Sequence, residues 1–425
     1  MAKPRMLFLA QCLPYPQHGG VAIRTYNILK HLARAFDVTA LCFVRHKRGV
    51  VREDLAARVG KLAKFGSVEA FPIEQEHSPR RLVWDHARSL ATLREYTYYA
   101  YSSASYLTRV RELVATRRFD LVHVDSLDLT RYLPLLAGNR AVCGHHNIES
   151  DLLRRRAGHE RSVARGAYMR VQAMLLRRAE RRWCRRVDLN VVVSELDRER
   201  LQALVGDVRC LVVPNGVNTE YFTPPEGAPA PRERNKRIVF VGGSVWFPNR
   251  DALHFFCLEV LPAIRAKVPD VQVQWVGTVT EEERRALGAR HGVEFPGYVE
   301  DIRPFVHAAG CYVVPLRVGG GTRLKILDAW AMGAAVVSTT VGCEGLTAEH
   351  GRNIVVADSP AGFADAVCGV LADEAVRDRL GREGRRTVEQ QYSWEIVGRQ
   401  MNLAYLELLN PRPEDVGRRS AAGGA

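Results

Sequence analysis

The sequence predicts an α/β protein built from two doubly wound, Rossmann-like domains. Apolar runs of strand length alternate with helical stretches along the chain, and near-continuous apolar strands indicate parallel sheets covered on both faces. The runs form two series, separated by a segment rich in proline, glycine and charge that is typical of a linker. Two such series indicate two doubly wound domains.

The predicted strands divide between the two series. Those of the first series are 6–11, 37–43, 121–125, 141–146, 189–194 and 210–215. Those of the second series are 237–243, 271–277, 293–297, 311–316, 334–339 and 353–358. The predicted organisation is a domain over 1–215, a linker over 216–236, a domain over 237–392, a final helix within 393–410 and a disordered tail over 411–425.

Length and composition are those of a soluble globular protein. A chain of 425 residues can form two or three domains, and its 47% hydrophobic and 25% charged residues are ordinary values. No apolar run reaches the ~20 residues that span a bilayer, and the N-terminus resembles a first strand more than a signal peptide, so we expect a cytoplasmic protein. The nine cysteines are scattered without a CxxC pair, which favours buried thiols over a zinc or iron–sulfur site.

A glycine run at 319–321 is the most informative motif of the second half. It follows the apolar strand 311–316 and precedes a predicted helix that starts near Thr322 and ends at Gly333. Glycine lets the backbone approach a ligand closely, and the free N–H groups and dipole of a helix N-terminus attract anions. Strand, glycine turn and helix in this order predict a site for a phosphorylated ligand.

The helix after this turn carries three candidate side chains. Arg323 and Lys325 lie in its first turn and would add charge-assisted hydrogen bonds to a phosphate. Asp328 follows them and suits a sugar hydroxyl better than a phosphate. The two cations would also fit a solvated helix face, so the combination with the first half of the chain carries the functional interpretation.

Two segments of the first half also follow predicted strands and carry candidates. One is a glycine turn before a helix; it lacks the GxGxxG pattern of nicotinamide or flavin sites, but its N–H groups could meet a phosphate, or it could be a plain βα turn. The other segment offers a polar contact or proton transfer to a substrate hydroxyl, without the spacing of a metal site. The candidates are His18, Gly19 and Gly20 in the first segment and His145, His146 and Glu149 in the second.

The formal net charge of +14 is concentrated in one arginine-rich helical stretch. Its arginines are Arg154, Arg155, Arg156, Arg161, Arg165, Arg170, Arg177, Arg178, Arg181, Arg182, Arg185 and Arg186. Three interpretations stay open: a solvated face, contact with anionic lipid headgroups, or nucleic-acid binding, which no recognised nucleic-acid module accompanies.

Several motifs together carry a family resemblance. They are GG at Gly19–Gly20, HHN at His145–Asn147, VVVSELD, VVPNGVNTEYF, FVGGSVWFPNRDAL, FPGYVEDIRPFV and GGGTRLKILDAWAMGAAVVSTTVGCEGL. In this order they resemble a GT-B glycosyltransferase, in particular the retaining family-four enzymes that use nucleotide sugars. The resemblance extends to about Trp394 and is greatest to the branch that acts on exopolysaccharide or other cell-envelope glycans.

The resemblance implies a function and a set of site residues. The enzyme would transfer a sugar from a nucleotide-diphosphate sugar to a hydroxyl of a glycan or lipid-linked acceptor, with retention and without a metal or other cofactor. The donor would bind in the cleft between the two domains, and the protein would be cytoplasmic or peripheral on the inner face of the plasma membrane. The implied residues are His146, Arg323 and Lys325 in catalysis, Gly19, Gly20, Gly243, Tyr298, Val299, Gly320, Gly321, Thr322 and Asp328 in donor binding, and His18, His145 and Glu149 on the acceptor side.

Individual roles follow from the same resemblance. Gly20 would donate its N–H to the β-phosphate, and His146, rather than His145, would contact the transferred sugar. Asp328 would bind the ribose hydroxyls, Tyr298 and Val299 would lie near the nucleobase, and the final helix would cross back onto the first domain.

The chain also departs from the family pattern. Gly320 stands where relatives carry the first of two carboxylates, and the second is Asp328 rather than glutamate. Gly243 and Asn249 occupy the places of an arginine and a lysine. We hypothesise that Arg323 and Lys325 supply this missing charge and clamp the diphosphate.

Three other functions also fit this sequence. A nucleotide-sugar epimerase would act on the donor without an acceptor, and a phosphorylase would need a pyridoxal-phosphate lysine or a free phosphate site, neither of which the sequence identifies. A catalytically inactive glycan- or nucleotide-binding subunit is made plausible by Gly320.

Overall fold

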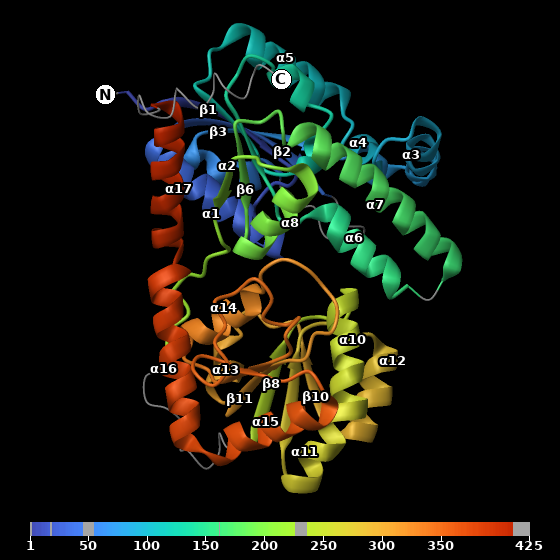
Figure 1. Cartoon of the computed structure of the whole chain (residues 1–425), viewed down its shortest axis with the longest axis vertical. Helices are drawn as coiled ribbons and strands as arrows, with labels where there is room; N and C mark the ends of the chain where they lie inside the picture. The colour runs from blue at the N-terminus through green and yellow to red at the C-terminus, as the bar shows by residue number, and fades with distance from the viewer. Residues whose placement is uncertain (1, 18, 46–54, 161, 226–235, 411–425) are drawn as a thin grey trace. The chain divides into compact units, whose positions relative to one another are not determined.

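The computed structural model describes residues 2–17, 19–45, 55–160, 162–225 and 236–410. The chain forms two compact units, one from Met1–Pro214 with Val397–Ala425 and the other from Asn215–Ile396. In each unit, helices cover the faces of one sheet (Figure 1). The predicted fold class of two parallel-sheet α/β domains is confirmed. Residues 226–235 of the predicted linker and the predicted tail 411–425 lie outside the described residues.

The first unit contains the strands β1–β7 and most of the C-terminal helix. Its elements are β1 (Arg5–Ala10), α1 (Gly20–Ala35), β2 (Asp37–Val44), α2 (Leu55–Leu62), η1 (Ala63–Phe65), β3 (Ser67–Pro72), η2 (Glu74–His77), α3 (Pro79–Thr92), α4 (Tyr96–Ala100), α5 (Ala104–Thr116), β4 (Leu121–Val124), η3 (Leu127–Leu129), η4 (Leu133–Leu136), β5 (Ala141–Gly144), α6 (Glu149–Gly158), α7 (Val163–Trp183), β6 (Leu189–Val192), α8 (Glu195–Val205), β7 (Cys210–Val212) and α17 (Trp394–Leu409).

The second unit contains the strands β8–β13. Its elements are β8 (Arg237–Val241), α10 (Phe247–Phe255), η5 (Phe256–Val260), α11 (Leu261–Lys267), β9 (Gln272–Val276), α12 (Glu281–Glu283), η6 (Arg284–Ala289), β10 (Val293–Gly297), α13 (Arg303–His307), β11 (Cys311–Val314), α14 (Leu324–Ala331), β12 (Val336–Ser338), β13 (Val355–Val356), α15 (Pro360–Ala372) and α16 (Glu374–Gln391).

The first sheet has the strand order β3-β2-β1-β4-β5-β6-β7, and its strands pair in parallel. β1 and β2 are buried along almost their whole length, as expected for strands covered on both faces. The direction of winding reverses between β1 and β4, and ligands of such sheets bind beyond the carboxyl ends of the strands at this reversal.

One strand of the first sheet was not predicted. β3 is a half-buried edge strand that pairs with β2 and ends at Pro72. An edge strand buries little of its surface, so its sequence SVEAFP lacks the continuous apolar run by which the other strands were found.

The second sheet repeats the same winding with the order β10-β9-β8-β11-β12-β13. Its strands also pair in parallel, and the reversal falls between β8 and β11. The loops after β8 and after β11 therefore meet at the edge where a ligand of this unit would bind. These loops are the predicted GGSVWFPN and glycine-run segments.

The C-terminal helix α17 packs within the first unit from Val397 onward, alongside α1 (Figure 1). Tyr405 is fully buried, and its hydroxyl lies 3.0 Å from Nδ1 of His123 on β4. Arg140 donates to the backbone carbonyls of Leu408 and Leu409, which satisfies part of the helix C-terminus. A side chain at Gly398 would collide with His31 of α1, so glycine permits this close approach.

Ser194, in the VVVSELD motif, caps α8: its hydroxyl accepts from the backbone N–H of Asp197 at 3.1 Å. All nine cysteines are free thiols. In the described part of the chain, no helix combines the length and apolar character needed to cross a membrane.

Candidate functional site

The carboxylate of Asp125 is the centre of a polar cluster at the winding reversal of the first sheet. Asp125 directly follows β4 and is 2% exposed. Thr25 of α1 donates to its Oδ2 at 2.6 Å. Nε2 of His146, in the loop after β5, lies 3.5 Å from Oδ2, and Nε2 of His123 lies 3.7 Å from Oδ1. We call Asp125, Thr25, His123 and His146 the Asp125 cluster.

The cluster holds a buried negative charge. Burial opposes ionisation of Asp125, but the contacts with His123 and His146 outweigh it and hold the pKa of this carboxyl well below its ordinary value. Burial lowers the pKa of His123, which favours its neutral form. Asp125 therefore presents an anion to His146, and that contact restricts where the imidazole ring can lie.

The two adjacent histidines occupy different environments. His145 is 3% exposed, its Nε2 lies 3.0 Å from Oδ1 of Asn190, and Cys184 packs beside it. Burial lowers the pKa of His145 to about 4, so it is a neutral residue of the interior. His146 instead belongs to the Asp125 cluster. The structure thus separates a histidine of the interior from one at the candidate site.

The glycine turn before α1 lies at the same edge of the first sheet. Gly19 precedes α1 with φ +90°, which favours glycine, and a side chain built there would meet no atom within 4 Å. Gly20 is the first residue of α1, where backbone N–H groups lack partners in the helix. The predicted candidate His18 lies outside the described residues.

Glu149 begins α6, three residues after His146 of the Asp125 cluster. Nδ2 of Asn147 donates to its Oε1 at 3.1 Å. Burial, and next the nearby Asp128 carboxylate, raise the pKa of Glu149 to about 8. Burial also raises the pKa of Asp128, against the opposing charge of Arg45. Glu149 can therefore hold a proton near neutral pH.

In the second unit, Lys325 reaches the loop after β8. Its Nζ donates to Oδ1 of Asn249 at 2.9 Å and lies 3.9 Å from the centre of the Phe240 ring. Asn249 also donates from Nδ2 to the carbonyl of Gly243 at 2.9 Å. A side chain at Gly242 would lie only 2.8 Å from Nζ, so glycine leaves room for the lysine. The side chain of Lys325 thus lies beside Gly242, where the Asn249 amide and the face of the Phe240 ring hold its amine in place.

Lys325 has no carboxylate to balance its charge among the described residues. Burial, and then the charge of Arg323, lower the pKa of Lys325 well below its ordinary value. An anion bound beside Nζ would reverse this shift, because opposite charge stabilises the ammonium form.

Arg323 is directed differently from Lys325. It is 5% exposed and lies at the N-cap position of α14, where its Nη1 donates to the carbonyl of Gly320 and its Nη2 to that of Val341 at 3.4 Å. A side chain at Gly319 would collide with the guanidinium. Arg323 therefore links two loops by hydrogen bonds: the glycine turn, through Gly320, and the loop after β12, through Val341.

Asp328 lies on α14 one turn after Lys325. Burial raises its pKa to about 7, and within the described residues no hydrogen bond or ion pair reaches its carboxylate. The buried hydroxyl of Tyr312 on β11 likewise has no hydrogen-bond partner in the described structure. Buried polar groups without partners are rare, and they favour a bound ligand that supplies the missing contacts.

The remaining donor-side candidates surround the same edge of the second sheet. Gly321 has φ +70° and Gly320 precedes it in the turn, while Thr322 accepts from Asn215 at 2.7 Å. The helix begins at Leu324, two residues later than predicted, because Arg323 adopts an extended backbone at the cap. Tyr298, after β10, is 68% exposed, whereas Val299 packs against the core.

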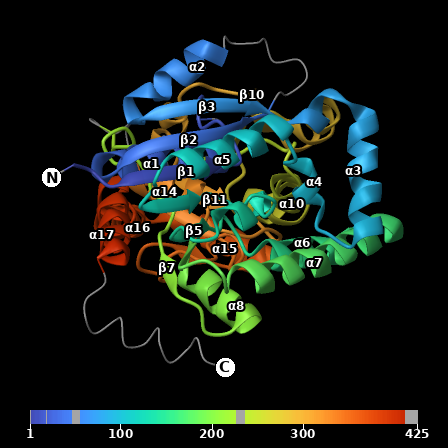
Figure 2. The same cartoon turned by 90° about the horizontal axis from the view of Figure 1, so that it is seen from above.

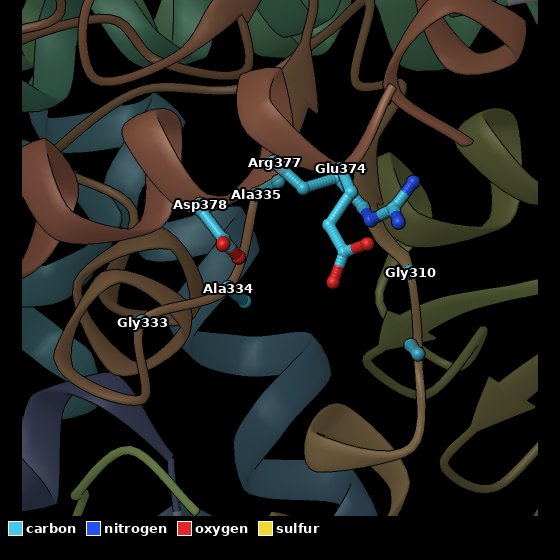
Figure 3. Close-up of a pocket in the computed structure, with 8 residues that line it drawn as sticks. Gly310, Gly333, Ala334, Ala335, Glu374, Arg377 and Asp378 are labelled. Carbon is cyan, nitrogen blue, oxygen red and sulfur yellow. The ribbon is translucent and has the colours of Figure 1, made fainter. Parts of the chain in front are cut away.

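A small hollow elsewhere in the second unit does not belong to this edge. Figure 3 shows it between Gly310, Ala334 and the side chains of Glu374 and Asp378. Gly310 and Ala334 precede β11 and β12, so the hollow lies at the amino ends of the strands. Ligands of open α/β sheets bind at the opposite, carboxyl edge.

Sequence reasoning missed Asp125 and Thr25. Asp125 was counted as the last residue of a predicted strand, and the signal that could have identified it is an acid at a strand's carboxyl end beside the reversal of a doubly wound sheet. Thr25 lies inside the helix after the glycine turn and carries no motif of its own. Its role depends on how α1 packs on β4.

Two family models match the chain. The model described as Glycosyltransferase Family 4 matches residues 18–221, and the model described as Glycosyl transferases group 1 matches residues 235–373.

Curated relatives match parts of the chain. A GDP-mannose-dependent monoacylated alpha-(1-6)-phosphatidylinositol monomannoside mannosyltransferase of Corynebacterium glutamicum is 28% identical over 236 residues, which is 51% of this chain and 61% of the relative. The lipopolysaccharide core biosynthesis glycosyltransferase LpsE of Rhizobium meliloti is 32% identical over 160 residues, 35% of this chain and 44% of the relative. The chain thus spans about half the length of these relatives.

Solved structures match almost the whole chain. Sucrose-phosphate synthase from Thermosynechococcus elongatus has a TM-score of 0.68 and 18% identity, with 96% of this chain and 100% of that chain covered. Anabaena Alr3699/HepE in complex with UDP has a TM-score of 0.65 and 16% identity, with 95% and 100% covered. At these identities the likeness shows the fold.

Proposed function

Because the chain belongs to the GT-B glycosyltransferases of family four, we propose that it transfers a sugar from a nucleotide-diphosphate sugar to a hydroxyl of a glycan or lipid-linked acceptor. The proposed reaction retains the anomeric configuration and needs no metal or other cofactor. The relatives named above include enzymes of phosphatidylinositol mannoside and lipopolysaccharide core synthesis. The proposed role is therefore cell-envelope glycan synthesis, including exopolysaccharide, by a cytoplasmic protein at the surface of an anionic membrane.

The contact between Lys325 and Asn249 is the observation that carries this proposal. Asn249 stands where the family pattern has a lysine, and the amine of Lys325 reaches its side chain at 2.9 Å. In this proposal, a cation supplied from α14 takes over the role of the one that the family pattern has in the loop after β8. This placement supports diphosphate binding at the glycine turn, with the N–H groups of the turn beside it.

The same arrangement suits the chemistry of the leaving group. As the sugar–phosphate bond breaks, negative charge grows on the departing diphosphate, and a fixed cation in a desolvated site stabilises that charge most strongly. The oxygen of this phosphate can accept the proton of the attacking hydroxyl on the same face of the sugar. That route gives retention and requires neither a covalent nucleophile nor a metal. Arg323 would act by holding the turn rather than by touching the phosphate.

The Asp125 cluster supplies the proposed contact with the transferred sugar. His146 would hydrogen-bond the sugar near its reacting carbon, and Asp125 would hold the ring in that orientation. Gly20 would meet the β-phosphate with its N–H, Asp328 would bind the ribose hydroxyls, and Tyr298 would lie near the nucleobase. Glu149 and His145 were assigned to the acceptor side; the burial of His145 limits it to supporting the loop.

A panel of donors tests the proposal. The purified chain is heated with UDP, GDP and their sugars, and a nucleotide that binds the folded state raises the melting temperature. The stabilising nucleotide sugar is then incubated with candidate acceptors, and the product's anomeric configuration is read by NMR. Retained configuration supports the proposal, whereas inversion contradicts the mechanism.

Two other results would redirect the assignment. Conversion of the donor sugar without an acceptor would indicate an epimerase. Tight nucleotide binding without turnover on any acceptor would favour a binding subunit, which Gly320 suggests because the family pattern has a carboxylate at that position.

A further inference from the structure

The helix α3 is amphipathic in the reverse of the usual sense. Its outer face is apolar: Val83 is 69% exposed, Trp84 is 61% exposed, and Leu90, Ala87 and Ala91 are exposed at helical spacing beside them. A helix that folds against a core normally buries such residues and exposes its polar ones. The apolar face of α3 therefore does not serve the folding of this unit.

The polar face of α3 is the buried one. Asp85 is fully buried and accepts from Arg81 at 2.9 Å. Ser89, also fully buried, donates to the carbonyl of Arg94 at 2.6 Å and accepts from Gln172 of α7 at 2.8 Å. These bonds satisfy the buried polar groups, so the orientation of α3 is a specific feature of the fold.

Aromatic contacts fix α3 in the same orientation. His86 stacks on Tyr96 with ring centres 4.0 Å apart, and its Nδ1 lies 2.5 Å from the hydroxyl of Tyr168 on α7. Figure 2 shows α3 at the periphery of the first unit, beside one end of the α6–α7 pair. The apolar outer face consequently points away from the rest of the unit.

The ends of α3 extend this apolar surface. Leu82 is 41% exposed, and Leu93, at the C-cap, is 60% exposed with φ +52°. A left-handed conformation is unfavourable for leucine by roughly 1 kcal/mol, and here it presents an apolar side chain to solvent. Solitary exposed apolar residues are ordinary, but a continuous group of this kind on one helix marks a contact surface.

Most of the charges around this surface are positive. Arg80, Arg88 and Arg94 are exposed on or beside α3, and the one acid of the helix, Asp85, is buried and paired. Arg88 and Arg94 lie over the rings of Tyr99 and Tyr98, at 4.7 Å and 4.6 Å. The neighbouring helix α7 adds further exposed arginines, among them Arg165, Arg170 and Arg177. Glu74, whose side chain is 41% exposed, lies 3.4 Å from Arg81 at one end of the helix, and the exposed arginines outnumber it. An apolar helical face bordered mainly by arginines matches an anionic lipid surface.

We infer that α3 is a membrane-docking helix, whose apolar outer face enters the headgroup–acyl boundary of an anionic bilayer while the surrounding arginines meet lipid phosphates. The inference deepens the membrane association within the proposed function and rests on it. In this inference, the apolar contacts with the membrane come from α3. The arginines of α6 and α7 contribute a longer-range electrostatic attraction. Nucleic acid would use the arginines but has no need of the apolar face.

Vesicle flotation with the full chain tests this inference. Wild type is mixed with phosphatidylcholine vesicles with or without phosphatidylglycerol, at low and at high salt. We expect binding to the anionic vesicles at low salt, reduced at high salt because screening weakens contacts with surface charges. Replacing Val83, Trp84 and Leu90 together by serine should lower the vesicle partition coefficient by roughly tenfold or more, because three apolar side chains no longer leave water.

Matched variants separate docking from general effects. Leu258→Ser removes an exposed leucine of the second unit, 52% exposed, and should leave vesicle binding unchanged. Arg80→Gln with Arg88→Gln should weaken binding to anionic vesicles, whereas Arg285→Gln with Arg386→Gln, in the second unit, should not. Unchanged melting temperatures show that each variant is folded, and the rise caused by the donor nucleotide shows that its site is intact.

The results distinguish the failures. If wild type binds vesicles and the serine variant binds them equally, docking by α3 is wrong while membrane association stands. If wild type binds no vesicle but forms dimers that the serine variant loses, the face is a self-association surface. Binding of single-stranded RNA in place of vesicles would overturn the assignment to lipid. None of these outcomes changes the nucleotide-dependent melting temperature, which tests the donor site separately.

Discussion

The winding reversals of the two sheets carry polar groups of opposite character. In the first unit, Asp125 is ionised and surrounded by partners, with Thr25 at 2.6 Å and two histidines at 3.5 and 3.7 Å. In the second unit, Lys325 and Asp328 are close along one helix, yet burial shifts both toward their neutral forms. At the first edge the buried charge of Asp125 faces two histidines, although Nε2 of His123 and of His146 makes no hydrogen bond within the described residues. At the second edge neither buried charge faces an opposite charge in the described part of the chain.

This difference teaches which edge should gain most from a charged ligand. A diphosphate would restore the charge of Lys325, and ribose hydroxyls would donate to Asp328, so ligand binding would relieve two unfavourable burials. The Asp125 cluster would gain no such relief and, in the proposed function, would hold His146 in place. We therefore expect the second unit to supply most of the binding energy for the donor and the first unit to orient the sugar.

The largest expected effect comes from Lys325. Lys325→Met should lower kcat by about 10²–10³-fold, because one fixed donor to the developing charge is lost. Its melting temperature should be unchanged or higher, since removing an unbalanced buried cation is not destabilising. Lys267→Met, at an exposed ion pair of the same unit, is the matched control and should keep wild-type turnover. Wild-type turnover of Lys325→Met would contradict the role of Lys325 in stabilising the departing diphosphate.

The second test concerns the coupling of Asp125 to His146. Asp125→Asn should lower kcat by about 10–100-fold, the worth of a hydrogen bond to a charged group, with little change in the donor KM. If Asp125 acts through His146, the double variant with His146→Ala should be no slower than His146→Ala alone, which a double-mutant cycle measures. Fully multiplicative effects would show that Asp125 contributes independently of the histidine.

A third test uses the raised pKa of Asp328. A carboxyl whose pKa rises on folding favours the folded state below its unfolded pKa, near 3.9, and this stability is lost as pH rises toward the folded value of about 7. Chemical denaturation of wild type should therefore show the free energy of unfolding falling by up to about 1.4 kcal/mol per pH unit in this window from this group. Asp328→Asn should remove that component.

The same group links pH to nucleotide binding. If ribose hydroxyls donate to the Asp328 carboxylate, the donor's affinity should rise between pH 5.5 and 8 on account of this group, by roughly tenfold per pH unit at most below its pKa. The pH dependence of the donor's affinity should be weaker in Asp328→Asn. Calorimetry measures this affinity for both proteins, and the difference between them excludes the titration of the nucleotide, which is the same in both experiments. Parallel pH profiles would contradict the assignment.

The smallest effect on turnover is expected at His145. His145→Asn leaves Asn190 without its partner and should cost roughly 1–3 kcal/mol of unfolding free energy, measured by denaturant titration. Turnover of the folded protein should change only a few-fold, in contrast to His146→Ala. If His145→Asn lost turnover without losing stability, His145 rather than His146 would be the histidine that contacts the sugar.

Much of the fold could be predicted from the sequence. The buried parallel strands are recognisable in the sequence as continuous apolar runs, and the sequence predicts all of them except β3. This edge strand buries too little surface to need a continuous apolar run. The glycine turns at 19–20 and 319–321 were located because positive φ angles and close approaches select glycine strongly.

Less of the candidate site could be predicted, because side-chain direction depends on packing. Arg323 and Lys325 are two residues apart and were assigned one role, yet one fastens the glycine turn and the other reaches Asn249. Residues two apart on a helix face different directions, and the late start of α14 placed Arg323 outside the helix altogether.

By itself, the sequence determined the two α/β domains, their parallel strands and the glycine turns, since apolar periodicity and glycine's backbone freedom are local properties. Only the tertiary structure decided that Asp125 meets His146 and Thr25, that Lys325 contacts Asn249, 76 positions earlier in the chain, and that α3 turns its apolar face outward. These features join residues distant in sequence, and their geometry is fixed by which helix faces pack on which strands.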